Sequence, residues 1–383
     1  MKELLNRELT WIEVEREALT HNIRQFRKIV GPDRILCPCI KAEAYGHGLV
    51  ETGRIFLDAG ADWLGVNALY EARKLRDAGI DSPIYILGYV PLEGLLEACE
   101  LKCRMVVYNT ETVERLGEIS KSMSEPVRVH IKIETGNNRQ GVLMKDLVEF
   151  AKSIMKYSNL EIEGVATHFA NIEDTTDHSY AKKQLNAFLD AVELLESEGV
   201  QVKYKHTANS AATLIMDETR LNMVRPGISC YGMWPSNEAY VSYQREVGGN
   251  FELKPSFTWK SKIAQIKTIA AGEYIGYGCT FRTSHETKLA VVPIGYYDGY
   301  DRGVSGAHVL VRGQRAPVRG RVCMNIIMVE VTDIPQASLE DEVVLIGGRG
   351  EERISAEQFA SWAGTINYEV PTRVNERIPR IIV

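Results

Sequence analysis

The chain of 383 residues lacks the features that mark membrane, secreted and nucleic-acid-binding proteins. It has no run of about 18 apolar residues that could cross a bilayer, and its opening residues 1–14 lack the apolar core of a secretory signal. Its formal net charge of −6, from 51 acidic and 45 basic side chains, gives no electrostatic reason to expect nucleic acid or an anionic membrane as a partner. We therefore expect a cytoplasmic protein.

The cysteines also lack a pattern that would bind a metal. Seven cysteines cannot all pair with one another, and the close pairs Cys37/Cys39 and Cys99/Cys103 have no second Cys or His pair at zinc-finger spacing. No Gly-x-Gly-x-x-Gly motif follows the first predicted strand, so a dinucleotide-binding fold has little support. The sequence thus predicts reduced, mostly buried thiols and no metal site.

Short apolar runs alternate with amphipathic stretches over residues 12–244. In the first amphipathic stretch, Leu19, Ile23, Phe26 and Val30 recur at the spacing of one helical face. The predicted strands cover residues 10–15, 34–42, 61–68, 82–89, 103–108, 127–134, 160–169 and 202–208. Such alternation is typical of βαβ units with a parallel sheet, and about eight strands in this length fit a (β/α)8 TIM-like barrel. A doubly wound open sheet is the alternative.

The pattern changes in the last third of the chain. Residues 245–383 contain strand-like runs separated by Gly, Pro and Asp turns, with few helical windows. Residues 245–255 carry a Gly-Gly pair and a proline, which is compatible with a linker. We therefore predict an α/β protein of two domains. The barrel covers residues 12–244, and a C-terminal antiparallel β domain covers residues 245–383 together with an N-terminal strand at residues 1–11.

One lysine stands at the end of an apolar predicted strand. Lys41 closes the run "ILCPCIK" and is followed by Tyr45 and two glycines. At the carboxyl end of a barrel strand it would face the active site, where burial lowers the pKa of an amine and makes it nucleophilic toward carbonyl compounds. The alternative is that Lys41 extends to solvent at the rim. The segment is no Walker A loop, because the lysine precedes the glycines.

Nine ordered blocks of sequence resemble the alanine racemase family along nearly the whole chain. They are IKAEAYGHG, HIKIETGNNRQG, ATHFA, ANSAATL, MVRPGISCYGM, GYGCTF, VPIGYYDGY, GRVCM and NYEV. The resemblance implies a barrel followed by a β domain, pyridoxal 5′-phosphate (PLP) held as a Schiff base, and interconversion of L- and D-alanine, the latter a peptidoglycan precursor. It also implies a homodimer whose active sites each combine the barrel of one chain with the β domain of the other.

A racemase needs two acid/base groups, because one proton leaves the α-carbon from one face and another returns to the opposite face. The resemblance makes Lys41 the PLP-binding lysine and one base, and Tyr277, contributed across the dimer interface, the other. Tyrosine titrates near pH 10, so it needs tuning to act at neutral pH. The resemblance assigns this tuning to His168 and Arg225. Without it, His168 at a strand end would more often be a structural histidine. Arg225, held by His206, would also keep the pyridine nitrogen unprotonated and so limit transamination.

The same resemblance implies the other contacts of the cofactor and the substrate. The implied cofactor-binding residues are Lys41, Tyr45, His168, His206, Ser210, Arg225, Gly227, Ile228 and Tyr368. Arg139 would contact the PLP phenolic oxygen and the substrate carboxylate, a use suited to its planar fork of donors. Lys132 matches a lysine that is often carbamylated and then orients that arginine. Met324 would bind the amino-acid substrate, and Tyr296 and Arg302 would line its entry corridor.

Three positions depart from the family pattern. Asn325 stands where the family commonly has Asp after Cys-Met, Glu134 replaces Asp in the Lys-x-Asp-Thr-Gly block, and Gln140 replaces Leu before its last glycine. Asn325 removes a negative charge beside the expected substrate site, and Gln140 adds a polar group. We therefore hypothesise, as the alternative to a strict alanine enzyme, a racemase of broader specificity that accepts serine, lysine or another longer amino acid.

Two other classes of function share parts of this architecture. PLP-dependent decarboxylases also combine a barrel with a β domain, but their His-x-Gly-Ser-Gly block is missing here. Non-enzymatic PLP-binding proteins share the barrel and the lysine but ordinarily lack a β domain, whereas residues 245–383 follow the barrel in this chain. The racemase prediction is therefore favoured over both.

Overall fold

The computed structural model describes residues 7–383 of the chain. The chain forms two compact units, which we call the barrel unit and the β unit. The barrel unit comprises Glu17–Ala44 and Leu49–Lys254. The β unit comprises Tyr45–Gly48, Pro255–Val383 and the described part of Met1–Arg16.

Three segments belong to the other unit than the one predicted. Residues 12–16 lie in the β unit, because the strand that contains residues 12–14 pairs there with two others. Residues 45–48 lie there too, where the carbonyl of Gly46 accepts a hydrogen bond of 3.0 Å from Arg380 Nε. Residues 245–254 belong to the barrel unit. Of the predicted N-terminal strand 1–11, residues 1–6 lie outside the described residues.

The barrel unit is built on eight short parallel strands. They are β2 (Ile35–Leu36), β3 (Leu64–Val66), β4 (Ile84–Ile86), β5 (Arg104–Val107), β6 (Val127–Lys132), β7 (Leu160–Ala166), β8 (Tyr204–His206) and β9 (Met223–Val224). Strands β3 to β8 form one sheet in sequence order, and β2 pairs with β9. A parallel bridge from Cys39 to Gly65 joins β2 to β3, and the Arg225 N–H donates to the Ala208 carbonyl at 2.9 Å beside β8. The ring therefore closes, which confirms the predicted barrel and excludes the open sheet.

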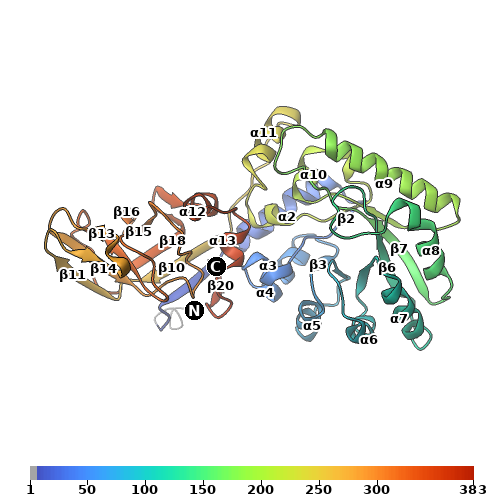
Figure 1. Ribbon diagram of the computed structural model, residues 1–383, viewed down its shortest axis with the longest axis horizontal. Helices are drawn as coiled ribbons and strands as arrows, with labels where there is room; N and C mark the ends of the chain where they lie inside the picture. The colour runs from blue at the N-terminus through green and yellow to red at the C-terminus, as the bar shows by residue number, and fades with distance from the viewer. Residues whose placement is uncertain (1–6) are drawn as a thin grey trace. The chain divides into compact units, whose positions relative to one another are not determined.

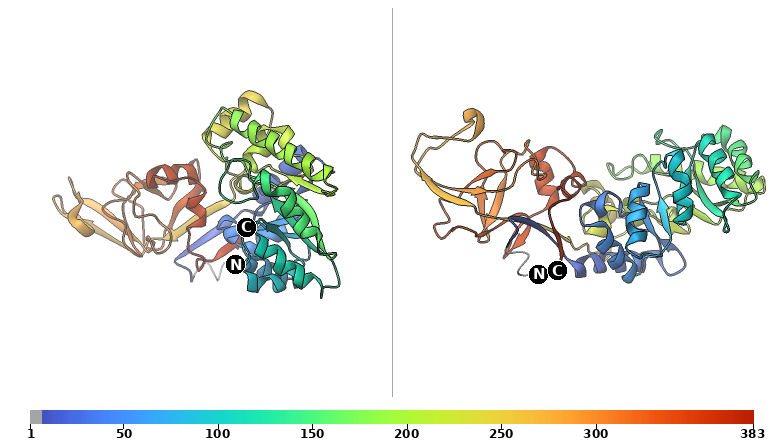
Figure 2. Two further views of the ribbon diagram at one scale, coloured as in Figure 1. Left: turned by 45° about the vertical axis from the view of Figure 1, so that its right-hand side comes forward. Right: turned by 90° about the horizontal axis from the view of Figure 1, so that it is seen from below.

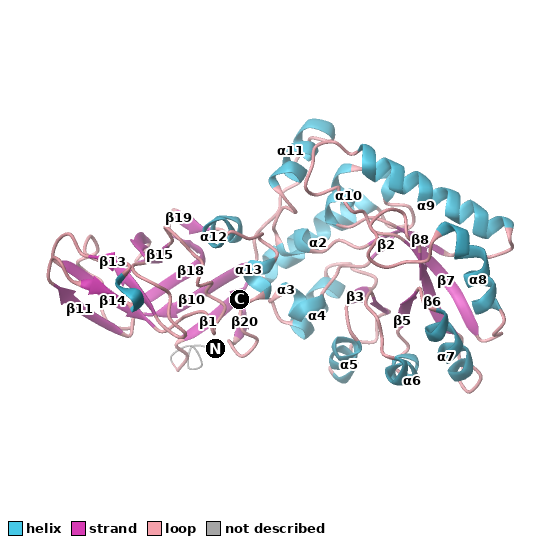
Figure 3. Ribbon diagram, in the orientation of Figure 1, coloured by secondary structure: helices cyan, strands magenta, loops and turns pink. Residues whose placement is uncertain are grey.

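Helices cover the outside of this ring (Figures 1 and 3; two further views in Figure 2). Helix α2 buries Leu19, Ile23, Phe26 and Val30, the four residues that share one face in the sequence. The helices are α2 (Arg16–Val30), α4 (Leu49–Asp58), α5 (Leu69–Asp77), α6 (Leu95–Glu100), α7 (Thr110–Ser120), α8 (Leu147–Met155), α9 (Ser179–Ser197), α10 (Ser210–Ile215) and α11 (Asn237–Glu246), with 3-10 turns η1 (Leu92–Gly94), η2 (Met144–Asp146), η3 (Asp217–Thr219) and η4 (Ile228–Tyr231). The label α3 (Lys41–Tyr45) marks a left-handed turn.

One predicted barrel strand was wrong. The run at residues 10–15 forms β1 (Thr10–Val14), which pairs antiparallel with β10 (Phe257–Lys262) and parallel with β20 (Arg380–Ile382) in the β unit. The eighth barrel strand is β9 instead. It has only two residues, which is too short for any period to show in the sequence.

The β unit has a core sheet with the strand order β16-β15-β18-β10-β1-β20, to which β19 adds by pairing with β18. Apart from the β1–β20 pair, its strand pairs are antiparallel, as predicted for this domain. Two smaller sheets, β11-β14-β17 and β12-β13, complete it. The remaining elements are β11 (Gln265–Ile269), β12 (Tyr274–Ile275), η5 (Tyr277–Cys279), β13 (Phe281–Arg282), β14 (Thr287–Val292), β15 (His308–Val311), β16 (Gln314–Pro317), β17 (Ile327–Glu330), β18 (Glu342–Arg349), β19 (Glu352–Ile354), α12 (Ala356–Ala363) and α13 (Glu369–Thr372).

Candidate active site

The carboxyl end of the barrel gathers basic side chains around one half-buried histidine. Lys41 follows the β2 segment, Lys132 ends β6, His168 follows β7, and Arg225 follows β9. Because all eight strands are parallel, these positions share one end of the ring. Burial lowers the pKa of His168 well below its usual range, and the charges of Lys132, Arg225, Arg139 and Lys41 lower it further. His168 is therefore a neutral imidazole inside a strongly positive pocket.

A left-handed turn fixes the backbone directly after Lys41. Residues 42–45 all have φ of 53°, a conformation that L-residues other than glycine rarely adopt. Glu71 on α5 holds the start of this turn, because its Oε1 accepts from the Ala42 N–H at 2.6 Å. Its Oε2 accepts from the Asn67 and Ala68 N–H groups at 2.7 and 3.0 Å. Glu71 is only 1% exposed. Sequence reasoning missed it, although a glutamate in the first turn of a helix is a common capping signal.

Arg225 is a buried cation held by neutral acceptors. Its Nη2 donates to the carbonyls of Thr167 and Thr207 at 2.8 and 3.3 Å, and its Nη1 contacts His206 Nδ1. Burial lowers the pKa of His206 well below its usual range, as do the nearby charges, with Arg225 first among them. Within residues 7–383, no carboxylate lies at ion-pair distance from Arg225. Because a guanidinium can only donate, Arg225 can also bind a further acceptor, such as a ring nitrogen.

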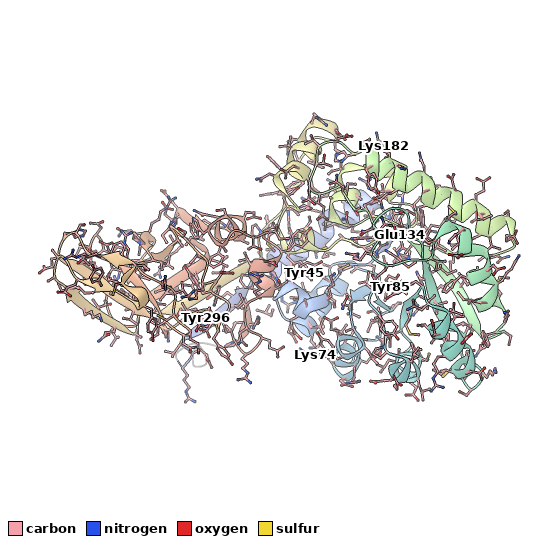
Figure 4. All side chains as sticks on the ribbon, in the orientation of Figure 1. Tyr45, Lys74, Tyr85, Glu134, Lys182 and Tyr296 are labelled. Atoms are coloured by element: carbon pink, nitrogen blue, oxygen red, sulfur yellow. The ribbon has the colours of Figure 1, made fainter. Side chains whose placement is uncertain are left out.

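Lys132 is the last residue of β6, and Arg139 lies in the loop that follows this strand. Burial lowers the pKa of the Lys132 amine well below its usual range, and the charges of Arg225 and Arg139 add to this effect. The loop with Arg139 is tied at its start by Glu134, shown just beyond β6 in Figure 4. The Glu134 carboxylate accepts from the Gly136 N–H at 2.6 Å. Its pKa is lowered: partial burial acts to raise it, but backbone N–H groups of residues 136–139 outweigh that effect.

A serine hydroxyl and several backbone N–H groups lie together where α10 and η4 begin. Ser210 begins α10, and its Oγ accepts from the N–H groups of Gly227 and Ser229 at 2.8 and 3.4 Å. Ile228 begins η4 between them. A serine hydroxyl, clustered backbone N–H groups and a nearby buried guanidinium form a donor set that fits an anionic phosphate group.

The β unit carries the other predicted residues. Tyr277 lies on η5 between two glycines with φ of 74°, and its side chain is 71% exposed. Met324 is 55% exposed, and its carbonyl accepts from the Tyr297 N–H at 3.0 Å, which ties the segment of Met324 and Asn325 to that of Tyr296, labelled in Figure 4. Arg302 is also exposed on the β unit. The rings of Tyr45 and Tyr368 lie together, with centroids 6.3 Å apart.

Both halves of the chain match one family of enzymes. Residues 14–235 match the description "Alanine racemase, N-terminal domain", and residues 256–382 match "Alanine racemase, C-terminal domain". The chain belongs to the alanine racemase family. The alanine racemase of Methanococcus maripaludis is 40% identical over 372 residues, which cover 97% of this chain and 98% of that protein. The resemblance drawn from the sequence blocks is confirmed, and the protein is an enzyme of the isomerase class.

Solved alanine racemases share the fold as well. The crystal structure of the enzyme from Bacillus anthracis with bound L-Ala-P has a TM-score of 0.91 at 39% identity, covering 98% of this chain and 95% of that chain. A Clostridium difficile alanine racemase in complex with cycloserine has a TM-score of 0.88 at 35% identity, covering 98% and 97%. In residues 7–383 of our protein, no helix is long and apolar enough to cross a membrane.

The departures from the alanine racemase pattern have local explanations in two of three cases. Glu134 caps the loop of Arg139 through backbone hydrogen bonds. Gln140 donates from its side-chain amide to the Tyr108 hydroxyl at 3.0 Å, so its polar group is already engaged within the barrel unit. Asn325 is exposed on the β unit, and nothing in the structure explains the replacement of the acid there.

Proposed function

We propose that the protein interconverts L- and D-alanine with PLP bound through Lys41. The observation that carries the proposal is that Lys41, Arg139, Lys132 and Arg225 lie close enough to the half-buried His168 for their charges to lower its pKa. The donor set fits the cofactor at three points: an amine for its aldehyde, a guanidinium for its ring nitrogen, and the Ser210 cradle for its phosphate. When bound, PLP withdraws electrons from the α-carbon and so makes its proton removable.

The two proton transfers are assigned to two side chains, one from each chain of the proposed dimer. Lys41 Nζ would move the proton on one face of the α-carbon and Tyr277 Oη on the other. We propose a homodimer in which Tyr277 reaches the barrel of the second chain. Tyr277, Met324 and Tyr296 support this, since all three are exposed on the β unit at 71, 55 and 43%. His168 would take part by accepting a hydrogen bond and so holding the phenol in place.

Arg225 and Arg139 would orient the substrate and its cofactor. Because arginine keeps its proton at all ordinary pH values, Arg225 would donate to the pyridine nitrogen and leave it unprotonated. Arg139 would hold a carboxylate through two parallel N–H bonds. Both roles need the two guanidinium groups to be fixed. His206 and the backbone carbonyls of residues 167 and 207 fix Arg225 in this way.

Lys132 is proposed to exist as a carbamate. A free ammonium beside Arg139 and Arg225 would repel both, and burial together with these two charges lowers the pKa of Lys132, which favours the neutral amine. A neutral amine attacks the carbon of CO2, forms an N–C bond and releases its proton to water, which yields an anion beside Arg139. Carbon-13 NMR in labelled bicarbonate should give one carbamate signal, and that signal should vanish in Lys132→Met. A spectrum without a Lys132-dependent signal would contradict the modification.

The assay of the central proposal follows solvent deuterium into the α-position of L- and D-alanine. Tyr277→Phe should lower racemisation by roughly 100- to 10,000-fold, the usual contribution of one acid/base group, and should impair exchange from one enantiomer more than from the other. Tyr274→Phe is the matched control, because Tyr274 is an exposed tyrosine three residues away that carries no proposed role. Equal racemisation by Tyr277→Phe and the control would refute the two-base assignment.

A racemase of broader specificity is the second candidate. Because Gln140 is bonded to Tyr108, this candidate now rests on Asn325 alone. Racemisation of L-serine or L-lysine at a rate comparable to L-alanine would support it. Activity confined to alanine would remove it.

A further inference from the structure

A line of buried polar groups runs from Arg225 through the interior of the barrel. His206 Nε2 lies 2.7 Å from His130 Nδ1, and His130 Nε2 lies 3.2 Å from Glu163 Oε2. Arg104 Nε donates to the same Glu163 oxygen at 3.2 Å. Exposure is at most 4% for Arg225, His206, His130 and Glu163. None of the sequence blocks of the family contains Glu163, which lies in the buried part of strand β7.

The line follows the length of the barrel. His206 is the last residue of β8, His130 lies in the middle of β6, and Glu163 lies in the middle of β7. Arg104 is the first residue of β5 and Arg128 the second of β6, with its Nε 3.6 Å from Glu163. The contacts therefore connect the cofactor end of the ring with the opposite end.

Only one arrangement of protons satisfies every contact. A guanidinium can only donate, so His206 Nδ1 must accept from Arg225. A neutral His206 then carries its proton on Nε2 and donates to His130 Nδ1. Neutral His130 in turn carries its proton on Nε2 and donates to the Glu163 carboxylate. A protonated His130 would turn an N–H toward the N–H of His206, which excludes that form.

The electrostatics agree with this assignment. Burial lowers the pKa of both histidines, which keeps them neutral at pH 7. Burial acts to raise the pKa of Glu163, but His130 and Arg104 outweigh it, and the carboxylate is ionised. Glu163 is thus an anion linked to the cation of Arg225 through two polarised imidazoles.

Aromatic rings and a glycine pack closely around the imidazole of His130 and hold it in this orientation. The rings of Tyr85, Trp63 and Tyr204 surround it, with centroids 4.8, 6.0 and 6.1 Å away, and Tyr85 is labelled among the barrel strands in Figure 4. The register of β6 against β7 shifts between Val129 and His130, beside Gly164. A Cβ on Gly164 would lie 2.6 Å from His130 Nδ1, so only glycine leaves room for the imidazole.

We propose that His130 and Glu163 are positioning residues that fix the tautomer of His206 and thereby the orientation of Arg225. The proposal deepens the proposed function and rests on it for the role of Arg225 at the cofactor ring. Without an acceptor at position 130, the His206 ring loses its partner and is free to turn an N–H toward Arg225. A displaced guanidinium would no longer hold the ring nitrogen unprotonated, and transamination would compete with racemisation.

The test uses the PLP-loaded full-length enzyme with nitrogen-15 in its histidine rings. The chain has eight histidines, so single substitutions can assign the signal of His206. The wild-type spectrum should show His206 with a protonated Nε2 and a bare Nδ1. His130→Phe should lose this single tautomer, and His130→Gln should keep it, because the amide can both accept from His206 and donate to Glu163. The ratio of cofactor lost as pyridoxamine phosphate to alanine racemised should rise about tenfold in His130→Phe, the size expected for one buried hydrogen bond.

A matched pair of glutamates separates this role from general stability. Glu163→Gln removes the anion at the end of the line of buried polar groups. Glu161→Gln removes a carboxylate of the same strand, which lies 3.4 Å from the same Arg128 but does not belong to that line. We expect the product ratio to rise in Glu163→Gln and to stay at the wild-type value in Glu161→Gln. A wild-type His206 with its proton on Nδ1, or an unchanged ratio in both His130→Phe and Glu163→Gln, would overturn the proposal. Because the tautomer is read without turnover, an enzyme that racemises no alanine but shows the expected spectrum would refute the proposed function alone.

Discussion

Replacing Glu71 by glutamine should weaken both the fold and the placement of Lys41. Four successive left-handed residues, each at about 1–2 kcal/mol, leave roughly 4–8 kcal/mol of strain that other contacts must offset. Glu71 supplies three of those contacts, at 2.6, 2.7 and 3.0 Å, through both oxygens. Glutamine can accept through one oxygen only and must turn its NH2 group toward a backbone N–H. We expect a loss of about 2–4 kcal/mol in unfolding free energy.

The assay combines urea unfolding at fixed protein concentration with racemisation of alanine. A small shift of Lys41 should lower the turnover rate by roughly tenfold or more, since catalysis depends steeply on alignment. Glu97→Gln is the control, because it removes an exposed ion pair with Arg73 on the outer helices and should leave both readouts nearly unchanged. If Glu71→Gln unfolds at the same urea concentration as the control, the turn is not held by this carboxylate and the reasoning fails.

Three further predictions follow from strain, titration and packing. Ala42→Gly should stabilise the protein by about 0.5–1 kcal/mol, because glycine adopts positive φ without a steric penalty; equal or lower stability in urea would contradict this. The pKa values of His130, His168 and His206 are lowered in the fold, so the unfolded chain binds more protons below its ordinary histidine pKa of about 6.5. Stability should therefore fall as the pH drops from about 7 to 5, by up to about 1.4 kcal/mol per histidine and pH unit, and a flat profile would refute the assignment. Gly164→Ala should cost about 1–3 kcal/mol, because its methyl group meets His130; a wild-type unfolding midpoint would show that the strand can yield there.

Much of the fold could be predicted because its signals are local. The alternation of apolar runs and amphipathic stretches specified a parallel barrel, and the spacing of Leu19, Ile23 and Phe26 identified the buried face of α2. The change to turn-rich strands near residue 245 indicated a second, largely antiparallel domain. Each of these patterns lies within a window of 10 to 20 residues, which is the range over which one helix or strand repeats.

The errors came from pairings between distant parts of the chain. The strand at residues 10–14 alternates like any half-buried strand, and only its partners β10 and β20, more than 240 residues away, place it in the β unit. Strand β9 has two residues, so its membership in the barrel rests on its pairing with β2. Local periodicity cannot reveal which strand lies beside which.

For the active site, the sequence by itself determined the chemical inventory: a lysine at a strand end, the family blocks and the basic residues that they contain. Only the tertiary structure decided which of these groups face one another. It added Glu71 and Glu163, which lie in none of the blocks, and it gave a role to His130, the first residue of the block HIKIETGNNRQG. It also placed the amide of Gln140 on Tyr108. The physical reason is that a buried polar group is defined by its partner, and inside a closed barrel the partners are side chains of different strands that meet in its interior although they lie far apart in the sequence.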